Sequence, residues 1–230
     1  MEHVTMALKA AFIITTLLAV YLFYRARNQS RAFLLLALIW MAIQLCLGLA
    51  GFYQNQSTTP PRFILLILPP FLLIAGMLLT SKGRKFMDGL NLKQLTLLHT
   101  IRIPVEIVLY YLFIAKVIPK IMTFEGSNFD IISGLTAPLI YYLGFTAKKF
   151  SNSITIIWNV LCLGLLINII ILAIFSTKTS FQQFGFDQPN IAITHFPFNW
   201  LASVIVPLVL FSHVATLRKV TVVRNKSGNR

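Results

Sequence analysis

Four side chains that can bind or exchange charge fall on one face of a long apolar stretch. His99, Arg102, Glu106 and Tyr110 are spaced three or four residues apart, which places them along one side of an ideal helix. A cationic side chain near a bilayer centre costs about 2.5–3.5 kcal/mol on insertion scales. Such groups persist where they face a bundle interior, pair with one another or contact water. We therefore predict that this stripe is an interior substrate-binding site.

The spacing within the stripe also predicts a role for each charged group. If the helix enters lipid at Leu95, Arg102 lies roughly 10 Å deep and Glu106 roughly 16 Å deep, near the midplane. Arg102 and Glu106 are then placed to pair, and Pro104 between them frees a backbone carbonyl and favours a kink. Glu106 is the protonatable member, and Arg102 either holds an anionic group or tunes Glu106. The function favoured by this pattern is binding or translocation of a small polar or ionic solute, or of a proton.

A purely structural interpretation of the same stripe stays open. Arg102 and Glu106 could act only as a clamp that ties their helix to neighbouring helices. The partners available for such a clamp are amides in other apolar stretches: Gln44, Asn159 and Asn168. The protein would then be a non-catalytic sensor or scaffold subunit.

A second alternative uses two histidines. His213 lies about as far from the cytoplasmic side as His99, so the pair could ligate a metal or haem in a membrane enzyme or redox protein. Neither histidine belongs to a His-x-x-x-His pair, and no hydrolase or phosphate-binding motif is present. We therefore predict no cofactor and favour a protein that is not an enzyme.

Acidic groups and a histidine also occur in the segments expected at the outer surface. Glu125, Asp130, Asp187 and His195 could meet at the mouth of the bundle as a cation site. Scattered loop carboxylates are more often solvated or capping groups, and Ser127, Asn128 or Asp130 is able to cap the fifth span.

The composition defines the class of protein that must position these residues. Hydrophobic residues make up 57% of the chain and charged residues 11%, whereas a soluble domain carries about 25% charged residues. The apolar runs are about 17–24 residues long and do not alternate, which indicates helices rather than barrel strands. The net charge of +14 sits in short loops, where lipid head groups account for it, so the lipid bilayer is the expected partner and nucleic acid is not.

The apolar runs predict an all-α bundle of seven transmembrane helices in one domain, residues 1–219, followed by a short basic tail, residues 220–230. The expected spans are Met6–Phe23, Ala32–Gly51, Phe63–Thr80, Leu95–Ala115, Phe129–Phe145, Ile154–Phe175 and Trp200–Leu217.

The positions of lysine and arginine predict the orientation of this bundle. Every second connection is basic, and these connections and the tail hold Arg25, Arg27, Arg31, Lys82, Arg84, Lys85, Lys93, Lys148, Lys149, Arg218, Lys219, Arg224, Lys226 and Arg230. Lysine and arginine on the other side are fewer and are diluted by acidic residues such as Glu2. The positive-inside rule then places the N-terminus outside and the C-terminus in the cytoplasm. We expect a multi-pass protein of a cell membrane, of the bacterial inner-membrane kind.

Overall fold

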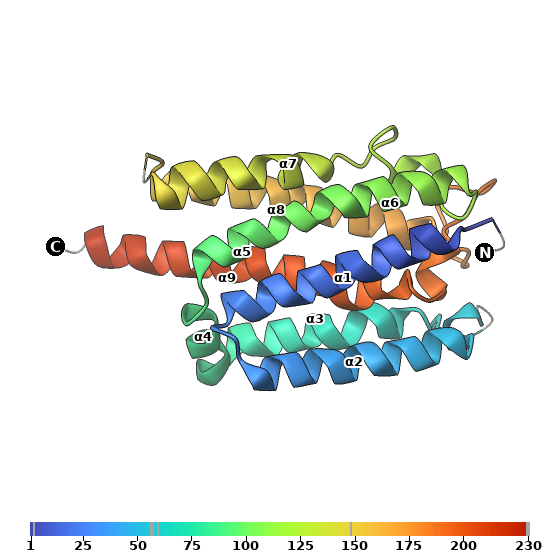
Figure 1. Ribbon diagram of the computed structural model, residues 1–230, viewed down its shortest axis with the longest axis horizontal. Helices are drawn as coiled ribbons and strands as arrows, with labels where there is room; N and C mark the ends of the chain where they lie inside the picture. Colours follow the sequence, from blue (N-terminus) through green and yellow to red (C-terminus); the bar gives the residue numbers. More distant parts are fainter. Residues whose placement is uncertain (2, 56–57, 59, 148, 229–230) are drawn as a thin grey trace.

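All regular structure in the computed structural model is helical across the residues that it describes (Figure 1). These are residues 1–228 without 2, 56, 57, 59 and 148, and from residue 222 only the backbone is described. The α-helices are α1 (Met6–Ala26), α2 (Arg31–Leu49), α3 (Ile64–Leu79), α4 (Ser81–Asp88), α5 (Leu92–Leu98), α6 (Arg102–Ile114), α7 (Ile131–Ile140), α8 (Asn152–Phe175) and α9 (Val206–Gly228). Short 3-10 turns are η1 (Phe52–Gln54), η2 (His99–Ile101), η3 (Lys120–Met122) and η5 (Ala192–Thr194), and two π-helical segments are η4 (Tyr141–Thr146) and η6 (Leu201–Ile205).

Helices occupy all seven of the predicted spans, but they differ in length. Among the described residues, five are long and apolar enough to cross a membrane: α1, α2, the run Leu92–Ile114, α8 and the run Leu201–Thr221. A sixth is obtained if α3 and α4, which are bent by 94° at their junction, count as one broken span. The remaining segment, α7 with η4, is a shorter apolar helix. This architecture fits an α-helical membrane protein.

Helix α9 lies at the centre of the bundle and α2 at its edge. In the most apolar window of each helix, 61% of residues are buried in Leu201–Thr221 and only 17% in α2. Large apolar side chains are exposed on α1, α2, α3 and α8, as expected where helices face lipid rather than water. In Figure 1, α2 and α3 form one side of the bundle and α7 and α8 the other, with α1, α5 and α6 between them.

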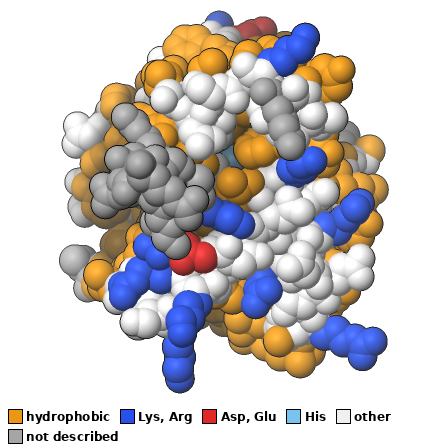
Figure 2. Space-filling view, turned by 90° about the vertical axis from the view of Figure 1, so that its left-hand side faces the viewer, with side chains coloured by type: hydrophobic (Ala, Val, Ile, Leu, Met, Phe, Trp, Pro, Cys, Tyr) orange, Lys and Arg blue, Asp and Glu red, His pale blue; other side chains and the backbone are white. Residues whose placement is uncertain are grey.

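One end of the bundle is basic. Figure 2 views the end at which α1 finishes, α4 lies and α9 leaves the bundle, and Lys and Arg side chains gather there. Of the charges used to predict orientation, Glu2, Lys148 and Arg230 lie outside the described residues, as do the side chains of Arg224 and Lys226. The backbone of the basic tail continues α9 as far as Gly228.

Prolines interrupt the regular hydrogen bonding of several helices. Pro104 cannot donate a backbone hydrogen bond to the residue four before it, and a 3-10 turn, η2, stands at that point. Leu92–Ile114 nevertheless runs as one 23-residue span, so the predicted break at Pro104 takes the form of a tightened turn. Pro138 lies just before the π-helical η4, and Pro207 follows η6; π-helical turns of this kind are frequent at functional sites.

Helix α7 is short because the chain before it folds back into the bundle. After α6 the segment of residues 115–130 makes its own turns, with Ser127 N–H donating to the Ile121 carbonyl and Asn128 N–H to Thr123. Helix α7 then packs against η2, α5 and α6 and begins near the middle of the bundle (Figure 1). Asp130, which precedes α7, is therefore buried at the depth of η2 and not at the outer surface.

Gly134 allows α7 to approach the η2–α6 junction closely. A Cβ atom at this position would lie 2.8 Å from Ile103 Cγ1 and 3.0 Å from the Ile103 backbone nitrogen. Gly164 in α8 is the matched comparison, because a Cβ atom there meets nothing within 4 Å. The close contact at Gly134 therefore helps to set the position of α7 beside Arg102.

We expect Gly134→Ala to lower the thermal unfolding temperature in detergent micelles, because forcing a methyl group against backbone costs about 1–3 kcal/mol. Gly164→Ala should leave it unchanged or raise it, since alanine favours a helix by up to about 1 kcal/mol over glycine. Equal unfolding temperatures for the two variants would show that the contact at Gly134 is not tight.

Candidate functional site

Arg102 connects four elements at the centre of the bundle. Its Nη1 donates to Asp130 Oδ1 at 2.6 Å and to the Cys162 carbonyl of α8 at 3.2 Å. Its Nη2 lies 2.8 Å from His213 Nε2 on α9. Arg102 is 2% exposed, so these contacts replace the water that its guanidinium would otherwise bind. The first residue of α6 is thereby tied to the start of α7, to α8 and to α9.

The contacts of His213 determine its protonation. An arginine guanidinium can only donate hydrogen bonds, so His213 Nε2 accepts from Arg102 and carries no proton. The other ring nitrogen, Nδ1, then holds the proton and donates to Asn159 Oδ1 at 3.0 Å. Asn159 Nδ2 in turn donates to the Thr155 carbonyl at 2.8 Å. His213 is thus a neutral imidazole held in one orientation between Arg102 and Asn159.

His99 and His213 are neighbours, as their predicted depths imply. Their rings stack with centroids 4.1 Å apart and an interplanar angle of 26°, and the edge of Trp158 packs on His99. Ring nitrogen lone pairs lie in the ring plane, so two stacked rings do not aim them at one point, and both nitrogens of His213 already have partners. No group of three or more His, Cys, Asp or Glu side chains that could hold a metal occurs among the described residues. The stacking therefore does not favour a shared metal or haem ligand pair.

Glu106 makes a different set of contacts from the one predicted. Its Oε1 accepts from Asn128 Nδ2 at 2.6 Å, and its Oε2 has no hydrogen-bond partner although the residue is 1% exposed. Asn128 also donates to the Met122 carbonyl and accepts from the Asp130 backbone N–H. The expected direct pair of Arg102 with Glu106 is wrong, because the folded-back segment brings Asp130 to Arg102 and Asn128 to Glu106.

The amides proposed as clamp partners divide between two roles. Asn159 supports Arg102 indirectly, through His213. Gln44 instead accepts from the Tyr53 hydroxyl, and Asn168 donates to the Ser127 carbonyl. Only Asn159 therefore belongs to the network of Arg102.

Tyr110, the fourth residue of the predicted stripe, lies apart from the other three. Its ring is half-buried and stacks on Phe124 with centroids 5.1 Å apart. It follows Glu106 by one turn on α6 but does not line the cavity described below. Tyr110 thus packs under the 115–130 segment.

The acidic residues expected at the outer mouth do not gather into one site. Glu125 faces Lys120 at 3.8 Å on the surface, and Asp187 is exposed. His195 Nδ1 lies 2.9 Å from the Ile191 carbonyl, and burial lowers the pKa of this histidine below its ordinary value. Asp130 points inward, and its side chain makes no capping bond to α7. Of the three residues predicted as able to cap this span, Asp130 holds the N-cap position, but no side chain among the described residues makes a capping hydrogen bond there.

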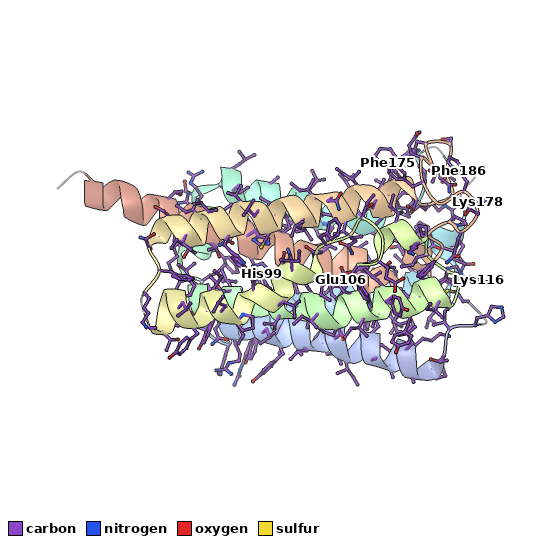
Figure 3. The ribbon with its side chains drawn as sticks, turned by 90° about the horizontal axis from the view of Figure 1, so that it is seen from above. His99, Glu106, Lys116, Phe175, Lys178 and Phe186 are labelled. Atoms are coloured by element: carbon purple, nitrogen blue, oxygen red, sulfur yellow. The ribbon has the colours of Figure 1, made fainter. Side chains whose placement is uncertain are left out.

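A cavity of about 70 Å³ lies beside Arg102 and Glu106. Its walls come from α3, α6, α8, η6, the start of α9 and the segment between α8 and η6, and they are apolar except at Arg102, Glu106, Asp130 and Asn190. One water molecule needs about 10–15 Å³ of such volume, so the cavity holds several waters or a small solute. Figure 3 shows Glu106 inside the bundle, between His99 and the end that carries Lys116 and Lys178.

The charges around this cavity do not balance if both carboxyl groups are ionised. Arg102 forms its ion pair with Asp130, which leaves Glu106 as a further buried carboxyl group. An unpaired carboxylate away from water is strongly unfavourable. Glu106 therefore either holds a proton or faces a cation in the cavity, and its free Oε2 is the atom available for that.

Asn128 and Asp130 are site residues that the sequence did not reveal as such. They stand at the predicted outer end of the span Phe129–Phe145, Asn128 just before it and Asp130 as its second residue. The feature that could have revealed them is the short length of the apolar run that follows. Its helix, Ile131–Thr146, has only 10 α-helical and 6 π-helical residues. At 1.5 Å per residue these 16 helical residues reach about 24 Å, less than the roughly 30 Å of hydrocarbon, so a complete crossing at this position would have to include the polar residues before the helix.

Removing the Arg102 side chain should destabilise the fold strongly. Arg102→Met leaves Asp130 as an unpaired buried charge, which costs about 3–5 kcal/mol, and thermal unfolding in detergent measures the loss. Replacing Asp130 by Asn in the same chain should recover part of it. Arg218→Gln is the control, because the pair of Arg218 with Asp88 is partly exposed and is worth less than about 1 kcal/mol. If Arg102→Met lowered the unfolding temperature no more than Arg218→Gln does, Arg102 would not hold the bundle together.

Comparison with known proteins gives one match. No curated protein and no solved structure matches the chain. A family model matches residues 59–221, more than two thirds of the 230 residues, and the match includes Arg102, Glu106 and Asp130 but not α1 and α2. The chain belongs to this family, which is described as a domain of unknown function (DUF8737).

Proposed function

We propose that this protein binds a proton or another small ionic or polar solute at Glu106 and translocates it across a membrane. One observation supports this above all others. Glu106 is buried with one free carboxylate oxygen at the charged end of an otherwise apolar cavity, while the charge of Arg102 is already balanced by Asp130. Ionisable residues inside membrane helices commonly mark ion pathways and proton relays.

The two charged residues of α6 have separate tasks in this proposal. Arg102 uses its donors on Asp130, Cys162 and His213 and so fixes the inner boundary of the cavity. Glu106 has only the Asn128 contact and is free to exchange a proton or to meet a cation. Arg102 therefore positions the site, and Glu106 binds the solute.

The segment between α8 and η6, residues 176–200, covers one side of the cavity. Asn190, Ile193 and Phe198 lie on the cavity wall, and Gln188 donates to the carbonyls of Phe113 and Ile118. The segment also donates two backbone hydrogen bonds, from Ile191 and Ala192, to the Val117 carbonyl, so it rests on the chain at the end of α6 through one side chain and two backbone groups. Access from the outer side requires only that this cover move, whereas access from the inner side requires the Arg102 network to open.

Replacing Glu106 by Gln tests the proposal. The amide keeps the shape of the side chain but cannot release a proton or carry a charge. The protein is reconstituted into proteoliposomes that contain a pH-sensitive dye. When a membrane potential or a sodium gradient is imposed, the wild type should move protons or sodium. We expect Glu106→Gln to reduce this flux about a hundredfold, as for removal of a positioned proton-transfer group.

Glu125→Gln is the matched control, because Glu125 is an exposed glutamate that faces Lys120 on the surface. It should transport like the wild type. Full flux in Glu106→Gln, or no flux of either ion in the wild type, would contradict the proposal.

We further propose a complete topology of seven spans in a cell membrane, with the N-terminus outside and the C-terminus in the cytoplasm. The N-terminus and the C-terminal end of α9 lie at opposite ends of the bundle (Figure 1), and an odd number of crossings is consistent with this placement. The basic end in Figure 2 carries the C-terminal end of α9, as the positive-inside rule expects for a cytoplasmic C-terminus. Helix α7 and the folded-back segment before it together make the seventh crossing.

Cysteine labelling in intact cells tests this topology. An impermeant maleimide should label Lys178→Cys, between α8 and η6, in intact cells, and Lys149→Cys, between η4 and α8, only after permeabilisation. The wild type controls for the native cysteines, of which Cys162 is buried and Cys46 is exposed on α2. The reverse pattern would invert the orientation, and labelling of both variants in intact cells would show that α8 does not cross the membrane, which contradicts the proposed topology.

A further inference from the structure

A second hollow lies on the other side of α3 and α9 from the charged cavity. It has a volume of about 660 Å³, within the roughly 300–1,000 Å³ of ligand-sized pockets. Its walls are the end of α1, the first half of α2, the second half of α3, α4, and the junction of η6 with α9. Leu36 and Leu73 on its wall are 59% and 56% exposed, so it is a groove that opens sideways to the surroundings of the bundle.

The groove exists because α2 is attached to the bundle mainly along its outer half. Trp200 Nε1 donates to the Met41 carbonyl, and Asn199 Nδ2 donates to the Gln44 carbonyl. Trp40 adds one further bond, from its Nε1 to the Ser203 carbonyl at 2.8 Å. Pro207 cannot donate to that carbonyl, so Trp40 satisfies it at the deep end of the groove.

The dimensions of the groove match one lipid chain. It extends from Ser30, the N-cap of α2, to Trp40, which lies ten residues further along the chain and therefore about 15 Å away. This is half of the hydrocarbon thickness of about 30 Å, the depth of one leaflet. The deep part is lined by apolar side chains and by three prolines, Pro69, Pro70 and Pro207, and prolines offer no backbone donor to a polar ligand.

The shallow end of the groove is cationic. The Arg27 guanidinium lies 4.5 Å from the centre of the Phe86 ring, and its Nε has no hydrogen-bond partner. Ser30 lines the groove beside it. Further basic residues stand in the same connections, namely Arg25, Arg31, Lys82 and Lys85, and Figure 2 shows the positive charge of this end. Basic pockets at the cytoplasmic side of membrane helices bind anionic lipid head groups.

We propose that this groove binds one acyl chain of an anionic phospholipid, with the head group at Arg27. The charge of the shallow end selects the head group, and the apolar deep end takes the chain. Binding does not depend on transport at Glu106, and only the assignment to the inner leaflet rests on the proposed topology. The lipid lies against α3 and the η6–α9 junction, whose opposite faces line the charged cavity.

Trp40 provides a direct test, because it lines the deep end of the groove. The full chain is placed in nanodiscs that contain a fixed fraction of phosphatidylglycerol or phosphatidylcholine with brominated chains. The fluorescence of Trp40 is taken as the difference between wild type and Trp40→Phe, which subtracts Trp158 and Trp200. Brominated phosphatidylglycerol should quench Trp40 with an apparent affinity about fivefold higher, the effect of one cation near a membrane surface.

Arg27→Gln should abolish this fivefold preference. Arg25→Gln should retain the preference. This substitution removes the same charge two residues away, but Arg25 is exposed and does not line the groove. Ala37→Phe, which fills the groove, should reduce quenching by both lipids and keeps the test valid if Arg27→Gln fails to fold. Equal quenching by the two lipids in the wild type, or an equal loss in Arg25→Gln and Arg27→Gln, would overturn the proposal. Glu106→Gln should leave the preference intact, so a failed transport assay does not decide this result.

Discussion

The arrangement of the bundle depends on the burial of one guanidinium. Arg102 stands ten residues into the run that begins at Leu92, about 15 Å along it, and it is almost completely buried. Its contacts with Asp130, Cys162 and His213 come from three other parts of the chain. Each contact restricts where α7, α8 and α9 can lie. The short α7 and the folded-back segment before it follow from the need to bring a carboxylate to this depth.

The sequence predicted the helical segments and the burial of the charged stripe well, because both follow from hydropathy and from helical spacing. It also placed His213 at the same depth as His99, since depth along a span can be counted from either end, but it did not show that the two rings stack. It did not predict the partner of Arg102. Hydropathy places Asp130 at the outer end of the fifth span, and only the three-dimensional path of the 115–130 segment shows that it turns inward. Pairing between side chains distant in sequence depends on tertiary contacts that a single sequence does not display.

Regular α-helix is interrupted beside the Arg102 network and between the two hollows. The 3-10 turn η2 and Pro104 border the Arg102 network, and η6 with Pro207 separates the charged cavity from the lipid groove. A carbonyl released by proline needs another donor in a membrane, and the Ser203 carbonyl finds it in Trp40. Such segments have weaker internal hydrogen bonding than regular helix, so they are where two arrangements of the same helices can differ at low energetic cost.

The two hollows therefore share a deformable wall. A chain in the groove rests on the outer face of α3 and η6, and a solute at Glu106 rests on the inner face of the same elements. Any shift of this wall changes both volumes in opposite senses, since close-packed interiors transmit displacement rather than absorb it. Coupling between two binding sites is reciprocal. A solute that expands the charged cavity would therefore lower the affinity for lipid, and lipid would lower the affinity for the solute by the same factor. If both proposals hold, the composition of the membrane contributes to the free energy of solute binding at Glu106.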